Sequence, residues 1–415
     1  MLASYVLDEY PAYQIWLERS LYNSRQMGSA CGSVWDEIHP LTHRRRAFSA
    51  QYCIILLVEF STRMCHDPRD RIYALNRILG LEPFDDLRPN YNIAAAEVFE
   101  RMTKKCLTQH GPQHKNTVPS LAVVLALAGL KSDVDNDNSL PSWVIDFHHL
   151  TNRSRAKALD YRACRMAQFK QDNLAFACIA PPTPANHITV RAYCFGTVVD
   201  VNDTPSCPRA YPEADSQSCH EPCSCFAHMM STNKQASSHQ QSLVLALIEW
   251  YCRCRSYAKS GMDSNNFERE FNRLLCCNDP DFSYYTRKLF SLDSFVKCAT
   301  LLDSESAFHS IADLDNEVMF DALQPFLEYQ SHPCFDRDRN LCRIRFRKRD
   351  YVAWVPKKTV PGDEICIFNG APYPFVVREA EPGIYKLLGD AYIQGIIEDE
   401  VMAAKPADAQ WLTLC

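Results

Sequence analysis

The sequence predicts an α+β fold, with mainly helical N-terminal and middle segments and a small antiparallel β unit at the C-terminus. Three observations lead to this prediction. Apolar residues recur at helical spacing over the first 130 residues and again between residues 242 and 330. Beyond residue 340 the spacing changes to alternation, which is typical of half-buried strands. Five of the 12 glycines fall in the last 54 positions, where they mark turns between short strands.

The N-terminal region, residues 1–150, is expected to be helical. Segments 11–23 and 46–65 carry apolar side chains at helical spacing. Two further helices are expected over residues 93–109 and 120–128, each with a glycine close behind its end.

A helix start is expected at Asp67. This residue can accept backbone N–H bonds as the N-cap, and Pro68 at the first helical position lacks a donor that would be unsatisfied there anyway. Asp70 follows at the third position, where a negative charge suits the positive end of the helix dipole.

A β-containing region is expected over residues 151–202. Residues 187–195 are rich in β-branched and aromatic side chains, and Gly196 is expected to mark a turn or bulge. Residues 203–240 are rich in Pro, Ser, Cys, His and Gln, a composition typical of a polar surface insertion or a disordered segment. Helices are expected again over residues 241–335.

The C-terminal antiparallel β unit is expected over residues 336–403. Cys342, Ile344 and Phe346 alternate with arginines, which is the period of a strand with one buried face. Further strands are expected between glycine-containing turns, at residues 364–368, 373–378 and 385–388.

The arginines of this first strand belong to a basic stripe, made of Arg343, Arg345, Arg347, Lys348 and Arg349. One interpretation is a phosphate-binding surface. The other is the solvated face of an edge strand, where charges also block unwanted pairing. The second is favoured, because the chain as a whole is mildly acidic.

Composition excludes several classes of protein. The 415 residues are 47% hydrophobic and 23% charged, as in soluble globular proteins. A net charge of −6 gives no basic excess for nucleic acid. The longest apolar runs fall short of the ~20 residues that cross a bilayer, and there is no secretory signal. We therefore expect a cytoplasmic protein with neither a nucleic-acid nor a membrane partner.

One cluster of residues has the chemistry of a metal site. Cys219, Cys223, Cys225 and His228 are ligand types that close a tetrahedral zinc site. Their spacing lacks the two C-x-x-C pairs of common zinc sites, so a Cys/His-rich loop that binds no metal is favoured. We expect no cofactor, with zinc as the alternative.

Three segments carry a family resemblance. The first, DPRDRIYAL, holds Asp67, Pro68, Arg69, Asp70 and Tyr73 and is followed by Pro89-Asn90-Tyr91. The second, LPSWVIDF, holds Trp143 and Asp146. The third runs from residue 355 to 400 and holds Gly362, Asp363, Pro374, Arg378, Gly389, Tyr392 and Gly395. In this order they resemble the landmarks of fungal heterokaryon incompatibility (HET) domain-containing proteins, with departures at Asn90, Ile145, Phe147, Gln394 and Asp399.

The resemblance implies structural roles for these landmark residues. It also implies that the family's signalling module precedes them, a module distantly similar to the TIR-type signalling fold, in which NAD cleavage occurs. The openings and closings typical of that module do not occur in this sequence, so we expect a C-terminal region that lacks it, as in a truncated gene product.

The sequence singles out no catalytic residue. No histidine is paired with a nucleophile by spacing, and no hydrolase or metalloprotease motif is present. We therefore expect a non-enzymatic recognition or regulatory region related to fungal non-self recognition, with an unidentified protein partner. The alternative is an enzyme or zinc-binding protein that uses an unrecognised Cys/His site.

Overall fold

The structure is a computed structural model of the chain. Nine stretches and seven further positions are described: 65–74, 87–108, 120–130, 140–148, 186–202, 253–262, 339–369, 373–394 and 409–415, with 54, 57, 267, 270, 271, 274 and 371. The predicted helix over 11–23, most of that over 46–65 and the insertion over 203–240 lie outside the described residues.

The chain divides into two compact units. The first comprises residues 1–163, 179–188 and 414–415, and the second comprises residues 164–178 and 189–413. They are called the helical unit and the sheet unit below, and each is described by itself.

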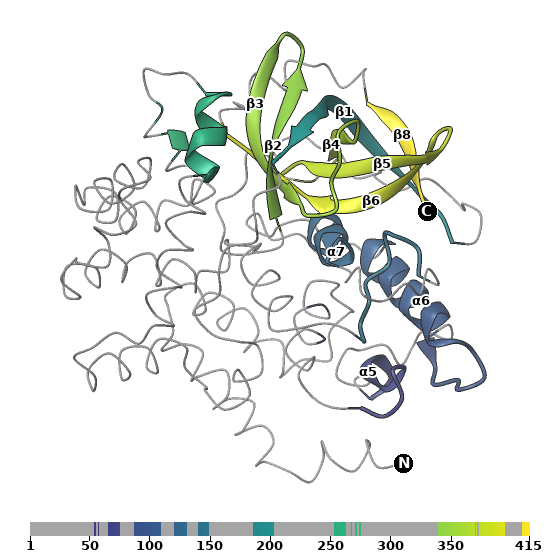
Figure 1. Cartoon of the computed structure of the whole chain (residues 1–415). Coiled ribbons are helices and arrows are strands. Elements are labelled where there is room, and N and C mark those ends of the chain that lie inside the picture. The colour runs from purple at the N-terminus through teal and green to yellow at the C-terminus, as the bar shows by residue number, and fades with distance from the viewer. Residues whose placement is uncertain are drawn as a thin grey trace, which may run out of the picture. The chain divides into compact units, whose positions relative to one another are not determined.

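The helical unit contains α5 (Asp70–Tyr73), α6 (Ala95–Thr108) and α7 (Ser120–Ala128) (Figure 1). The predicted helix over 120–128 agrees with α7 at both ends, and the one over 93–109 agrees with α6 to within two residues. One face of α6 is buried, and its exposed face carries ion pairs one turn apart. Because α7 is apolar on every side, its described side chains are all buried. Within the described residues, no helix has the length and apolar character needed to span a bilayer.

The sheet unit is built on eight strands: β1 (Ile188–Val201), β2 (Arg339–Phe346), β3 (Arg349–Pro356), β4 (Glu364–Phe368), β5 (Phe375–Glu381), β6 (Ile384–Asp390), β7 (Tyr392–Ile393) and β8 (Gln410–Leu414). Their order is β4-β5-β6-β8-β1-β2-β3-β7, and β1 also pairs with β4. This additional pairing closes β4, β5, β6, β8 and β1 into a ring, and β2, β3 and β7 extend from it (Figure 1). Closure removes sheet edges from these five strands.

The predicted fold class is wrong. Among the described residues strands outnumber helices, and the β unit is a sheet of eight strands rather than a small C-terminal one. Its 14-residue strand β1 comes from the middle of the chain and is long enough to pair with β4 along one part and β2 along another. Alternation in a sequence predicts that a strand exists, but not which distant strand it pairs with.

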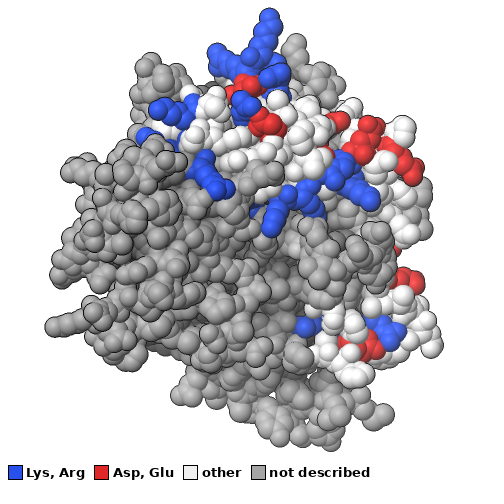
Figure 2. All heavy atoms as spheres, viewed as in Figure 1, with Lys and Arg blue, Asp and Glu red and all other residues white. Residues whose placement is uncertain are grey.

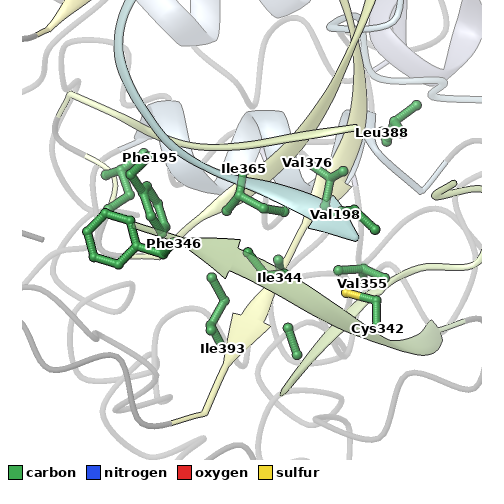
Figure 3. Close-up of a cluster of buried hydrophobic side chains, with 13 residues drawn as sticks. Phe195, Val198, Cys342, Ile344, Phe346, Val355, Ile365, Val376, Leu388 and Ile393 are labelled. Atoms are coloured by element: carbon green, nitrogen blue, oxygen red, sulfur yellow. The ribbon is translucent and has the colours of Figure 1, made fainter. Parts of the chain in front are cut away.

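The core of the sheet unit is a cluster of apolar side chains from seven strands (Figure 3). Phe195 meets Phe346 edge to face, with ring centroids 5.4 Å apart. Around them lie smaller aliphatic and thiol side chains, including Val198, Cys342, Ile344, Val355, Ile365, Val376, Leu388 and Ile393. The predicted alternation of β2 is confirmed, because Cys342, Ile344 and Phe346 belong to this core.

Candidate interaction surface

The hairpin of β2 and β3 turns at Arg347 and Lys348. Phe346 and Arg349 face each other across the strands, so two residues form the connection. Arg347 has φ 55°, a left-handed conformation that glycine or asparagine adopts at lower cost. Its guanidinium lies over the Phe346 ring, 5.1 Å from the centroid. The turn therefore presents two exposed cations, and one of them, Arg347, lies over a buried aromatic ring.

The base of the hairpin is fixed to β1 by a charged cluster. The Arg343 Nε donates to Asp200 Oδ2 over 2.7 Å, and its Nη2 bonds the same oxygen. Tyr257, on a helix over residues 253–259, donates its hydroxyl to Asp200 Oδ1. Burial alone would raise the pKa of Asp200, but these hydrogen bonds outweigh it and hold the pKa below its ordinary value. Asp200 thus stays ionised and orients both partners.

The pKa of Tyr257 responds in the opposite direction. Burial, followed by the hydrogen bond to the Asp200 carboxylate, raises it well above its ordinary value. The phenol therefore remains a neutral donor at physiological pH, as its structural role requires.

A second ion pair lies one step nearer the turn. Arg345 and Asp350 face each other across the strands, with Nε–Oδ1 2.8 Å and Nη2–Oδ2 3.1 Å. The hydrogen bond from Arg345 lowers the pKa of Asp350, so the carboxylate is ionised at neutral pH. Arg343 and Arg345 are therefore each oriented by two hydrogen bonds to a single carboxylate.

The basic surface is defined here as the cations of the helix over residues 253–259 and those of the hairpin between residues 343 and 349: Arg253, Arg255, Lys259, Arg343, Arg345, Arg347, Lys348 and Arg349. Blue side chains gather over the hairpin at the top of Figure 2, with red ones among them. Residues 343–349 carry five cations, of which Arg343 and Arg345 pair with Asp200 and Asp350, so a surplus of three positive charges is left there. The surface is electropositive although the chain carries a net charge of −6.

The expectation that this stripe lies on an edge strand is wrong. In the sheet β2 lies between β1 and β3. The arginines face away from the core on an interior strand, so blocking edge-to-edge pairing does not explain them.

The landmark residues of the sheet unit fix a loop to β5. Arg378 holds the Asp363 carboxylate with two bonds, Nε–Oδ1 2.7 Å and Nη2–Oδ2 2.9 Å. The second oxygen also accepts the backbone N–H of Val360 over 2.8 Å. Gly362 has φ 96°, which favours glycine, and its N–H donates to the carbonyl of Val198. Loop, β5 and β1 are thereby joined.

The remaining landmarks of this unit lie around β6 and β7. The carbonyl of Pro374 accepts the N–H of Ala391 over 2.8 Å, and Gly389 pairs with Val376. Tyr392 donates its hydroxyl to Gln394 Oε1 over 2.8 Å. Gly395 lies outside the described residues.

In the helical unit the first landmark segment is hydrogen-bonded to the loop that contains Tyr91. Arg69 Nη1 donates to the carbonyl of Tyr91 over 2.7 Å, and its guanidinium lies 5.2 Å from the Tyr91 ring centroid. Tyr91 in turn donates its hydroxyl to Asp70 Oδ1 over 2.5 Å, which raises the pKa of Tyr91 to about 12. Tyr73 meets the same ring edge to face.

The expected cap at Asp67 takes another form. Helix α5 begins at Asp70, after a turn that contains Pro68, and its N-cap residue is Arg69, which makes no side-chain cap bond. Asp67 Oδ1 accepts the backbone N–H of Arg69, and both carboxylate oxygens accept its guanidinium. The guanidinium therefore competes for the oxygens that sequence reasoning assigned to the helix start.

The second landmark segment packs within the helical unit. Trp143 is buried and donates Nε1–H to the carbonyl of Asn186 over 3.2 Å. Asp146 accepts the N–H of His148 over 3.0 Å, a local pairing.

The candidate zinc ligands Cys219, Cys223, Cys225 and His228 lie outside the described residues. Within the described stretches no group of three or more His, Cys, Asp or Glu side chains converges as a metal site would require.

Sequence reasoning missed the acidic partners of the basic surface, Asp200 and Asp350, and a buried pair between Arg339 and Asp390 with Nη2–Oδ2 2.5 Å. Asp350 had a signal, since a two-residue turn after Phe346 sets Asp350 opposite Arg345. Asp200 and Arg339 had none, because their partners are distant in the sequence.

A β domain of known type emerges from the comparisons. Residues 331–412 match the family model described as the Het-6 beta-barrel domain. Among curated proteins, the chain is 20% identical over 365 residues to the heterokaryon incompatibility protein 6, OR allele, of Neurospora crassa. That alignment covers 80% of this chain and 48% of the relative, so the chain spans about half the relative's length. No solved structure matches.

These findings confirm the resemblance seen in the sequence. The chain is similar to a fungal heterokaryon incompatibility protein, and the matched domain covers β2 to β7 and part of β8.

Proposed function

We propose that the chain is a non-enzymatic recognition region of a heterokaryon incompatibility protein and that its basic surface binds an acidic segment of a partner protein. The observation that carries the proposal is the exposed cationic turn at Arg347 and Lys348. The strands below it are held by the ion pairs of Arg343 with Asp200 and of Arg345 with Asp350. A preorganised cationic surface loses little side-chain entropy when an anionic partner binds.

Protein is favoured over nucleic acid by the lack of stacking platforms. Among the described residues the aromatic side chains that are more than half exposed are Tyr91 and Trp411, and neither belongs to the basic surface. Single-stranded nucleic acid depends on such aromatic faces. The net charge of −6 also opposes long-range attraction of a long nucleic acid that extends beyond the basic surface, whereas a short acidic segment contacts only the local positive surplus.

A labelled peptide of ten glutamates is the probe, and fluorescence anisotropy at low salt is the measurement. The triple variant Arg347→Glu, Lys348→Glu and Arg349→Glu should weaken binding at least about tenfold, because three cations that attract the peptide become carboxylates that repel it. The matched single variants are Lys348→Glu and Lys386→Glu, the latter an exposed cation on β6. Only the first should weaken binding.

Equal loss in both single variants would contradict the assignment of the surface. Tighter binding of single-stranded or duplex DNA than of the glutamate peptide, lost in the triple variant, would replace a protein partner with a nucleic acid.

The non-enzymatic part has its own test. The purified chain, incubated with NAD, should leave the dinucleotide intact. Turnover that a point substitution abolishes would contradict the proposal.

A further inference from the structure

Two cysteines of the ring lie directly opposite each other. Cys194 on β1 faces Cys366 on β4 in antiparallel register. Three positions away along the same ladder, the N–H of Asn369 donates to the carbonyl of Arg191, its direct partner, over 2.8 Å. Hydrogen-bonded and non-hydrogen-bonded pairs alternate in antiparallel ladders, so Cys194 and Cys366 form a non-hydrogen-bonded pair.

This type of pair suits a covalent link between the strands. Its Cα atoms lie ~4.5 Å apart and its side chains approach closely on one face. A disulfide needs a Cα separation of roughly 4.4–6.8 Å. A β-bulge follows immediately, between Cys194 and Gly196, and leaves Phe195 as the extra residue that bends β1 at this point.

The two thiols differ in access. Cys366 is fully buried, whereas the side chain of Cys194 is partly exposed. Burial, then the hydrogen bond with Cys194 and the charge of Glu364, raises the pKa of Cys366 well above its ordinary value. An oxidant in solution therefore meets Cys194 first, and Cys366 is the nearby second thiol.

We propose that Cys194 and Cys366 are a peroxide-sensitive dithiol that forms a disulfide between β1 and β4. Hydrogen peroxide oxidises the Cys194 thiol to a sulfenic acid and is itself reduced to water. The Cys366 sulfur then attacks the Cys194 sulfur, an S–S bond forms, and the sulfenic hydroxyl leaves with the Cys366 proton as a second water. The two thiols lose two electrons in total. The disulfide links β1 to β4, the two strands whose pairing closes the ring.

The test is peptide mapping of the unmutated full chain after brief treatment with hydrogen peroxide and alkylation under denaturing, non-reducing conditions. The expected result is a linked pair of peptides that contain Cys194 and Cys366, two hydrogens lighter than their sum, in the majority of chains. Reduction with dithiothreitol should restore two separate peptides. Alkylation of both cysteines, or a link from Cys194 to another of the 20 cysteines, would overturn the proposal.

Two serine variants separate this pair from general thiol oxidation. Cys366→Ser removes the second thiol, so a sulfenic acid should persist at Cys194 and react with dimedone. Cys342→Ser is the matched control, because Cys342 is also a buried strand cysteine of the sheet unit but faces Val201 and Ala353 rather than a cysteine. It should leave the Cys194–Cys366 link intact, and its loss there would overturn the proposal.

Discussion

The carboxylate of Asp363 shows how much of the sheet unit can depend on one side chain. It is 2% exposed, accepts the Val360 N–H and receives two bonds from Arg378. A buried carboxylate is stable only when such donors replace the water it has lost. The family landmark at this position therefore has a clear structural role.

Asp363→Asn should lower the free energy of unfolding by about 1 to 3 kcal/mol, since the amide keeps one acceptor but loses the charge that faces Arg378. The guanidinium is 38% exposed, which places the loss toward the lower end. Urea denaturation followed by circular dichroism measures it. Asp350→Asn is the control, because its exposed partner can turn to water. An equal loss in both variants would contradict the argument.

Asp67 makes a prediction about pH. Hydrogen bonds from the side chain and the backbone N–H of Arg69 lower its pKa from 3.8 to about 2. Because the folded-state pKa is depressed, the stabilisation is present above pH 3.8 and is lost as pH falls toward 2. Carbon-13 NMR of the carboxylate should show this low pKa, and Arg69→Gln should return it toward the ordinary value. An unchanged pKa in the variant would exclude Arg69 as the cause.

At the level of elements, the helix over residues 253–259 approaches β3 closely at its end. A Cβ built on Gly261 would lie 2.9 Å from Val352 Cγ2, closer than side chains tolerate. Glycine here allows the chain that leaves the helix to lie against the sheet, and this contact places Tyr257 near Asp200.

Gly261→Ala should therefore destabilise the sheet unit by roughly 1 kcal/mol through overpacking. Val352→Ala alone should also destabilise it, because it removes buried methyl groups. The double variant should cost less than the sum, since the new methyl fills the vacated space. Thermal unfolding of the four proteins forms the cycle, and strict additivity would show that the contact does not exist.

Local patterns predicted individual elements better than their assembly. Strand β4 matches its predicted range at both ends, and α7 does likewise. Strand β3 reads RDYVAWVP, with four consecutive buried residues and no alternation to mark it, and it was not predicted. The five-residue β8 was also missed. The basic stripe was recognised, but its acidic partner Asp200 could not be, because the contact spans 143 positions.

For the whole molecule, charge is distributed unevenly. A chain of net charge −6 carries a local positive surplus on one hairpin. Opposite charges on one molecule orient an approaching charged partner before contact, and added salt screens this effect.

Binding of the glutamate peptide should accordingly weaken about tenfold between 50 and 300 mM sodium chloride, as expected for an exposed charged interface. Titrations at several salt concentrations measure the slope. The triple variant of the turn should show little salt dependence, and a slope equal to that of the unmodified chain would place the interface elsewhere.

The ring that β1 closes also has a consequence for biosynthesis. Strand β1 leaves the ribosome well before its partners β4 and β8, which lie about 170 to 220 residues later in the chain. Contacts of such long sequence separation form slowly, and a strand is prone to aggregate until its partner strands have been synthesised and paired with it. Because β8 comes last, a stop codon just before Gln410 would leave β6 and β1 without the strand that joins them, and a nascent chain of this kind is a natural client for chaperones.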